Sequence, residues 1–115
     1  MEKIVRVWVW IFVIQWDKVL IWKRKNAHGN GKYWFPGWHL EFWETTEACS
    51  SRELFEESSL IAHIKDVETL GFTNDIMEDD QKHYITIFTR ITTFSWELEN
   101  TEPHKVENWE WFTWN

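Results

Sequence analysis

The stretch from residue 37 to residue 60 constrains the fold most. It begins with a glycine, Gly37, and contains a densely charged run at residues 52–57. Within the run, Glu53, Glu56 and Glu57 are spaced i, i+3 and i+4, so a helix would carry all three carboxylates on one face. Like charges at this spacing destabilise a helix by about 0.2–0.5 kcal/mol per pair. A divalent cation would offset this repulsion, because hard ions such as Mg²⁺ prefer carboxylate, water and phosphate oxygens. The spacing therefore predicts a helix whose acidic face holds a metal ion.

The residues around this run follow a longer pattern. Glu44 stands eight positions before Arg52, and the aliphatic residue Leu60 follows the run. The whole resembles the signature of the Nudix hydrolases: Gly, five residues, Glu, seven residues, Arg-Glu, an aliphatic residue, any residue, Glu-Glu, any residue, Gly and an aliphatic residue. Both glycine positions differ, because Trp38 and Ser59 occupy them. The matching positions are Glu44, Arg52, Glu53, Leu54, Glu56, Glu57 and Leu60.

Further segments resemble one branch of this MutT-like family, the small nucleoside triphosphate diphosphatases that act on purine or modified nucleotides. The resemblance covers most of residues 4–114 and implies an α/β fold, a Nudix-type α/β/α sandwich with a mixed β-sheet. It also implies metal-dependent hydrolysis of a nucleoside triphosphate, or another nucleoside diphosphate derivative, to a nucleoside monophosphate and pyrophosphate. Because relatives continue with a second helix, we expect the C-terminal helix to be missing from this chain. The segments are Lys23-Arg24-Lys25, Phe35-Pro36-Gly37, His83-Tyr84-Ile85-Thr86 and Glu107-Asn108-Trp109-Glu110-Trp111.

The resemblance assigns roles to individual residues. Glu53, Glu56 and Glu57 would bind Mg²⁺ or Mn²⁺, and which of them acts as the general base stays open. The backbone carbonyl of Trp38 would be a further metal ligand. Arg52 would orient the carboxylates through its bidentate guanidinium. The residues expected to contact the substrate are Arg24, His39, Thr86 and Trp111.

Each substrate contact has a structural alternative. The basic run at 23–25 is equally typical of a charged strand end. His39 would equally suit the packing of a loop, and Trp111 the core of a sheet. Two other functions also fit the pattern: a catalytically inactive nucleotide sensor of the same fold, and a hydrolase of nucleotide sugars or capped RNA ends.

Composition narrows the class of protein. One domain, residues 1–115, is expected from the length and from a hydrophobic content of 43%. The net charge of −7 argues against a nucleic-acid polymer as the partner, but not against a nucleotide substrate. We expect the single Cys49 to be a small buried hydrophobic residue. One cysteine cannot form an internal disulfide, which fits a reducing cytoplasm. The apolar run at 7–14 is too short to cross a membrane, and a homodimer stays open because similar proteins are often dimeric.

The hydrophobic pattern predicts the elements around the charged run. Residues 5–14 are apolar in both alternating sets, which is typical of a strand buried on both faces. Ala48, Ser51 and Phe55 lie on the side of the helix that we expect to pack on the sheet. The other expected features are an N-cap at Thr45 or Thr46, a turn at 15–18, a loop at 26–32, short extended pieces at 33–35 and 39–42, and strands at 19–23, 67–73, 84–93 and 109–112.

Tryptophan is the anomaly of the composition, with 11 residues in 115. Glycine often supplies a left-handed turn backbone, which costs a bulky residue about 1–2 kcal/mol. We hypothesise that UGA codons, which some genetic codes read as glycine and others as tryptophan, have been misread. The hypothesis predicts UGA at these positions and UGG at Trp109, Trp111 and Trp114, whereas a divergent aromatic-rich protein is the alternative. Relatives carry glycine clearly at Trp38 and Trp43, and by pattern at Trp8, Trp10, Trp16 and Trp22.

Overall fold

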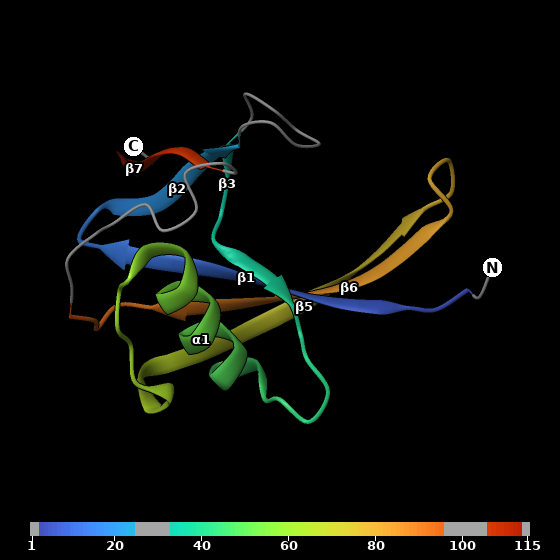
Figure 1. The fold of residues 1–115 in the computed structure, drawn as a ribbon, viewed down its shortest axis with the longest axis horizontal. Coiled ribbons are helices and arrows are strands. Elements are labelled where there is room, and N and C mark those ends of the chain that lie inside the picture. Colours follow the sequence, from blue (N-terminus) through green and yellow to red (C-terminus); the bar gives the residue numbers. More distant parts are fainter. Residues whose placement is uncertain (1–2, 25–32, 96–105, 114–115) are drawn as a thin grey trace.

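The computed structural model describes residues 3–24, 33–95 and 106–113 (Figure 1). The loop expected at 26–32 lies outside these ranges. Within them, no helix has the length and apolar character needed to cross a membrane. In chain order the elements are β1 (Arg6–Gln15), β2 (Lys18–Arg24), β3 (Tyr33–Trp34), β4 (Gly37–His39), α1 (Thr46–Ser58), the 3₁₀ helix η1 (Ile64–Asp66), β5 (Val67–Met77), β6 (Lys82–Ile91) and β7 (Val106–Thr113).

A mixed β-sheet forms the centre of the fold. Strands β3, β2, β1, β6 and β5 lie side by side in that order, while β4 pairs with β1 and β7 pairs with β2. β1 runs parallel to β6, and every other pair of these strands is antiparallel. Figure 1 shows α1 lying across β1, β6 and β5. The predicted α/β fold with a mixed sheet is confirmed, and the described residues contain one α-helix, without a second helical layer among them.

Strand β1 supplies much of the core. Val9, Ile11 and Val13 are fully buried, and burying each side chain contributes about 1.5–3 kcal/mol. Ile11 and Val13 share one apolar cluster with the helix, so this is the face that α1 covers. Trp8 and Trp10 alternate with these residues and are only half-buried. The prediction that β1 is buried on both faces is wrong, because the described helix covers one face only.

Helix α1 begins and ends with recognisable caps. Thr45 is the N-cap, and its hydroxyl accepts the backbone N–H of Ala48 at 3.1 Å, while Glu47 places a negative charge in the first turn. Ser59 ends the helix with a left-handed φ of 67°, and its N–H donates to the Phe55 carbonyl at 2.9 Å. Ser59 occupies the second glycine position of the signature, and this backbone explains why glycine is favoured there.

The buried side of α1 differs from the predicted one. Phe55 is exposed, and Ala48 and Ser51 are only half-buried, so the prediction that these residues pack on the sheet is wrong. Leu54 is the one large aliphatic residue of the helix, and its burial in the core fixes which side faces the sheet. The buried residues of α1 are Cys49, Ser50, Glu53, Leu54, Glu57 and Ser58. Two signature carboxylates are therefore buried together with the core-facing side.

Two tryptophans have a left-handed backbone. Trp16 opens the two-residue turn between β1 and β2 with φ 56°, and Asp17 follows with a negative φ, as in a type II′ turn. Trp43, in the loop before α1, has φ 66°. Their side chains are 87% and 92% exposed, respectively. The backbone supports glycine at these two positions, whereas the other four candidate positions lie in β1, β2 and β4 at negative φ.

Replacing Trp16 or Trp43 by glycine is expected to stabilise the protein by about 1 kcal/mol each, because backbone strain is relieved and little buried surface is lost. Trp22→Gly is the matched control: Trp22 belongs to the core, so its loss is expected to destabilise by about 3–5 kcal/mol. Urea unfolding of the three variants measures these changes. Lower stability of Trp16→Gly and Trp43→Gly would contradict the conclusion that the left-handed backbone strains these two tryptophans.

Candidate catalytic site

The guanidinium of Arg52 contacts three acidic residues of the signature. Arg52 donates to both carboxylate oxygens of Glu44, from Nε at 2.6 Å and from Nη2 at 3.0 Å. Its Nη1 atom donates to Glu53 at 2.7 Å and lies 3.3 Å from a carboxylate oxygen of Glu56. Glu44 also accepts the backbone N–H of Glu41 at 3.1 Å. The bidentate pair therefore fixes the loop before α1 against the helix, which fits a positioning role for Arg52.

The three signature glutamates occupy different environments. Glu53 and Glu57 are 6% and 2% exposed, whereas the side chain of Glu56 is 52% exposed. Burial raises the pKa of Glu53, and this effect outweighs the opposing hydrogen bond from Arg52. The neighbouring Glu56 carboxylate raises the pKa of Glu53 as well.

The donor atoms of this cluster suit a hard divalent cation, because they are all carboxylate oxygens. Glu53 and Glu57 lie one helical turn apart, and Glu56 stands beside them on the exposed side. Among the described residues, no three His, Cys, Asp or Glu side chains are arranged so as to hold a metal ion, and Arg52 engages two of the carboxylates instead. The chemistry of the donor set fits Mg²⁺ or Mn²⁺.

Gly37 allows β4 to approach β1 closely. It pairs with Trp10 at a φ of 144°, and a Cβ atom there would lie 1.9 Å from the carbonyl oxygen of Val9. Only glycine fits this position. The pairing continues with Trp38 opposite Val9 and with His39 opposite Trp8. Strand β4 therefore places Trp38 and His39, both predicted site residues, just before the loop that leads into α1.

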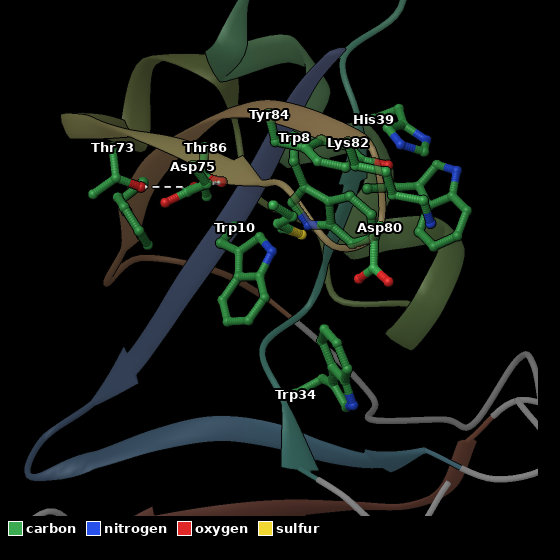
Figure 2. A pocket seen from close by; sticks show the side chains of 13 residues that line it. Trp8, Trp10, Trp34, His39, Thr73, Asp75, Asp80, Lys82, Tyr84 and Thr86 are labelled. Atoms are coloured by element: carbon green, nitrogen blue, oxygen red, sulfur yellow. Dashed lines mark hydrogen bonds between the residues drawn. The ribbon is translucent and has the colours of Figure 1, made fainter. Parts of the chain in front are cut away.

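A cavity of about 560 Å³ is lined by Trp8 and Trp10, which alternate along β1 with the residues that face α1, so the cavity lies on the other face of the sheet. Figure 2 shows the lining side chains. The cavity volume lies within the range of about 300–1,000 Å³ that is common for small-molecule sites. Aromatic rings form most of the wall, and the polar groups come mainly from β5, β6 and the turn between them. The lining residues are Trp8, Trp10, Trp34, Trp38, His39, Thr73, Asp75, Met77, Asp80, Lys82, Tyr84, Thr86 and Phe88.

His39 connects this cavity to the carboxylate cluster. Its ring lies edge-on to Trp8 at 4.9 Å and is stacked with Tyr84 at 6.0 Å. Within the described part of the chain, its buried Nε2 atom has no hydrogen-bond partner, and burial lowers the pKa of the imidazole. The His39 carbonyl accepts a weak hydrogen bond from Cys49 Sγ at 3.8 Å, and the same sulfur lies 3.9 Å from Nη2 of Arg52.

Cys49 serves packing rather than chemistry. It is fully buried in α1, as the sequence predicts. Burial raises the pKa of its thiol to about 12, so the thiolate needed for nucleophilic attack is scarce at neutral pH.

The structure brings together only part of the predicted substrate site. His39 and Thr86 both line the cavity. Trp111 lies elsewhere, because in β7 it packs on the core cluster and is stacked with Phe94 at 6.1 Å. Arg24 ends β2, and its side chain is outside the described part of the structure.

Sequence reasoning missed Asp75 as a cavity residue. Strand β5 continues to Met77, beyond the predicted end at residue 73. The register pairs Asp75 with Tyr84 and Thr73 with Thr86, which places their side chains on one face. Thr73, Asn74 and Asp75 form an unbroken polar run without alternation, so the sequence does not show which of them faces the cavity until the hairpin register is known.

Residues 4–115 match the NUDIX domain family. The ADP-ribose pyrophosphatase of Methanocaldococcus jannaschii is 34% identical over 89 residues, which is 77% of this chain and 52% of the relative. The chain thus spans about half the length of this curated relative. With the signature geometry in place, the match shows that the chain belongs to the NUDIX domain family.

Solved structures show the same fold. A MutT NUDIX hydrolase from Burkholderia pseudomallei has a TM-score of 0.87 at 24% identity, covering 96% of this chain and 84% of that chain. A bifunctional NMN adenylyltransferase/ADP-ribose pyrophosphatase from Francisella tularensis, complexed with AMP and a Mn ion, has a TM-score of 0.75 at 22% identity. That similarity covers 99% of this chain and 35% of the other.

The two carboxylate pKa shifts predict opposite effects on the stability of metal-free protein. The hydrogen bond from Arg52 lowers the pKa of Glu44, so its contribution is present at neutral pH and is lost as the pH falls through the lowered value. Glu44→Gln is therefore expected to destabilise by about 2 kcal/mol at pH 7. The pKa of Glu53 is raised, so its ionisation opposes folding as the pH rises, and Glu53→Gln is expected to stabilise at pH 7.

Urea unfolding in EDTA, from about pH 3 to pH 8, measures both effects. Each difference from the wild type should fade toward acid pH, where both carboxyl groups carry a proton. Effects of the same sign at pH 7 would contradict the burial and pairing described for Glu44 and Glu53.

Proposed function

We propose that this chain hydrolyses a nucleoside triphosphate to a nucleoside monophosphate and pyrophosphate. The proposal rests on the charged hydrogen bonds that Arg52 donates to Glu44 and Glu53, next to the buried Glu57. Attack of water on the inner phosphorus breaks its bond to the bridging oxygen and releases pyrophosphate. Residues 1–115 would form one domain that draws on the nucleotides of the cytoplasm.

Glu53, Glu56 and Glu57 would hold Mg²⁺ or Mn²⁺, together with the backbone carbonyl of Trp38. When bound, the cation would neutralise the phosphates and lower the pKa of a water ligand. Arg52 keeps the Glu53 carboxylate in one orientation through its charged hydrogen bond. A glutamate of this group accepts the proton of the attacking water.

The aromatic cavity would hold the nucleobase. Trp8 and Trp10 present rings to it, and stacking of a base on an aromatic side chain is worth about 1–3 kcal/mol. His39 lines the same cavity and contacts Cys49 on α1. A nucleotide with its base in the cavity would therefore extend its phosphates past His39 toward the carboxylates.

ADP-ribose is a second candidate substrate, favoured by the 34% identity to the ADP-ribose pyrophosphatase of M. jannaschii. It is also a nucleoside diphosphate derivative, so the same carboxylates would serve. Hydrolysis of its pyrophosphate linkage would yield AMP and ribose 5-phosphate.

The test is product release from a panel of nucleoside triphosphates and ADP-ribose with Mg²⁺. Glu57→Gln is expected to lower kcat about 10²–10⁴-fold, and EDTA is expected to stop turnover. Glu47→Gln is the matched control, because Glu47 lies on the same helix but binds Thr69. Equal turnover by the two variants, or turnover that persists in EDTA, would contradict the proposal.

A further inference from the structure

The cavity carries one polar corner, formed where β5 and β6 pair. Resting on the function proposed above, we propose that Asp75 selects the base, and that the preferred base is a 2-amino-6-oxopurine, the guanine type. Asp75 would accept hydrogen bonds from the N1–H and the 2-amino group of that base. It is a specificity-determining residue that stands apart from the carboxylates of α1.

Two hydroxyl groups fix the Asp75 carboxylate. Thr86 Oγ1 donates to Asp75 Oδ2 at 2.6 Å, and Thr73 Oγ1 donates to the same oxygen at 3.0 Å. Figure 2 shows the three side chains together at one side of the cavity. The other carboxylate oxygen, Oδ1, receives no hydrogen bond from any described residue, although Asp75 itself lines the cavity. The carboxylate is therefore pre-positioned with acceptor capacity to spare.

The hydroxyl protons of Thr73 and Thr86 are already used, so this corner offers acceptors only. Guanine presents two adjacent donors, N1–H and the 2-amino group, which match a carboxylate in bidentate fashion. Adenine and cytosine each present an amino group beside a ring nitrogen lone pair, and that lone pair would face the carboxylate. Uracil and thymine present one N–H between two carbonyl oxygens. Hypoxanthine keeps N1–H but lacks the second donor.

The rest of the cavity complements the same base. Lys82 is the one Lys or Arg side chain among the described lining residues, and its ammonium suits the acceptors O6 and N7 on the adjoining edge of guanine. Tryptophan rings from β1 and β3 provide flat apolar surface for either purine. Stacking alone therefore does not separate guanine from adenine, and the discrimination falls to Asp75.

The decisive experiment compares kcat/KM for GTP, ITP and ATP in the wild type and in Asp75→Asn. The wild type is expected to prefer GTP over ATP by about 10–100-fold, with ITP between them. Asp75→Asn should lower kcat/KM for GTP by about the same factor and leave that for ATP unchanged or higher, because the amide adds a donor. Asp79→Asn is the matched control: Asp79 lies in the adjacent turn and does not line the cavity, so the GTP/ATP ratio should stay at the wild-type value.

Asp75 also links the two strands of the hairpin, and the experiment separates that role from base selection. A purely structural role would lower turnover of GTP, ITP and ATP alike and leave their ratio unchanged. That outcome would overturn the inference, as would a wild type without preference for GTP over ATP.

Binding of nucleoside monophosphates keeps the test independent of catalysis. Calorimetry with GMP and AMP in EDTA measures base preference without turnover. Tighter binding of GMP, reduced in Asp75→Asn, would support the role of Asp75 even if no triphosphate were hydrolysed, an outcome that defeats only the proposed function. Equal binding of GMP and AMP by the wild type would overturn the role of Asp75 and leave the proposed hydrolysis to its own test.

Discussion

The arrangement of the whole site depends on the ion pairs of Arg52. Burying a carboxylate costs several kcal/mol unless a charge or a proton compensates it. The chain compensates with the guanidinium of Arg52, which donates hydrogen bonds to Glu44 and Glu53. Because Glu44 belongs to the loop and Glu53 to α1, the same guanidinium also connects two segments of the chain. A lysine could not replace it, because a single ammonium cannot match the bidentate geometry at Glu44.

The two faces of the sheet have different surroundings. On one face, α1 buries alternate residues of β1 and brings the carboxylates into the fold. On the other face, the intervening tryptophans and the hairpin of β5 and β6 form the cavity. β4 reaches both regions, since His39 lines the cavity while its carbonyl contacts Cys49 of α1. Under the proposed function, the alternation of side chains along a strand would separate the chemistry of the phosphates from the recognition of a base.

The sequence predicts those parts of the molecule that depend on local spacing. The helix that carries the charged run, an N-cap at Thr45 or Thr46 and the turn at 15–18 are all such features, and the structure contains each of them, with Thr45 as the cap. The buried side of α1 escaped prediction because it depends on the sheet. Burial of the Leu54 side chain outweighs the repulsion among the carboxylates only when a sheet is present to pack against it. The position of Asp75 in the cavity escaped prediction for a similar reason, since it depends on a hairpin register that no local pattern fixes.

The concentration of indole rings around the cavity gives the protein a built-in optical probe. Trp8, Trp10 and Trp34 line the space that a stacked base would enter, and indole emission responds strongly to an aromatic neighbour. Trp16 stands in solvent on the turn between β1 and β2, so its emission would supply a steady background. Occupancy of the cavity could thus be followed by intrinsic fluorescence, without attaching a dye to ligand or protein.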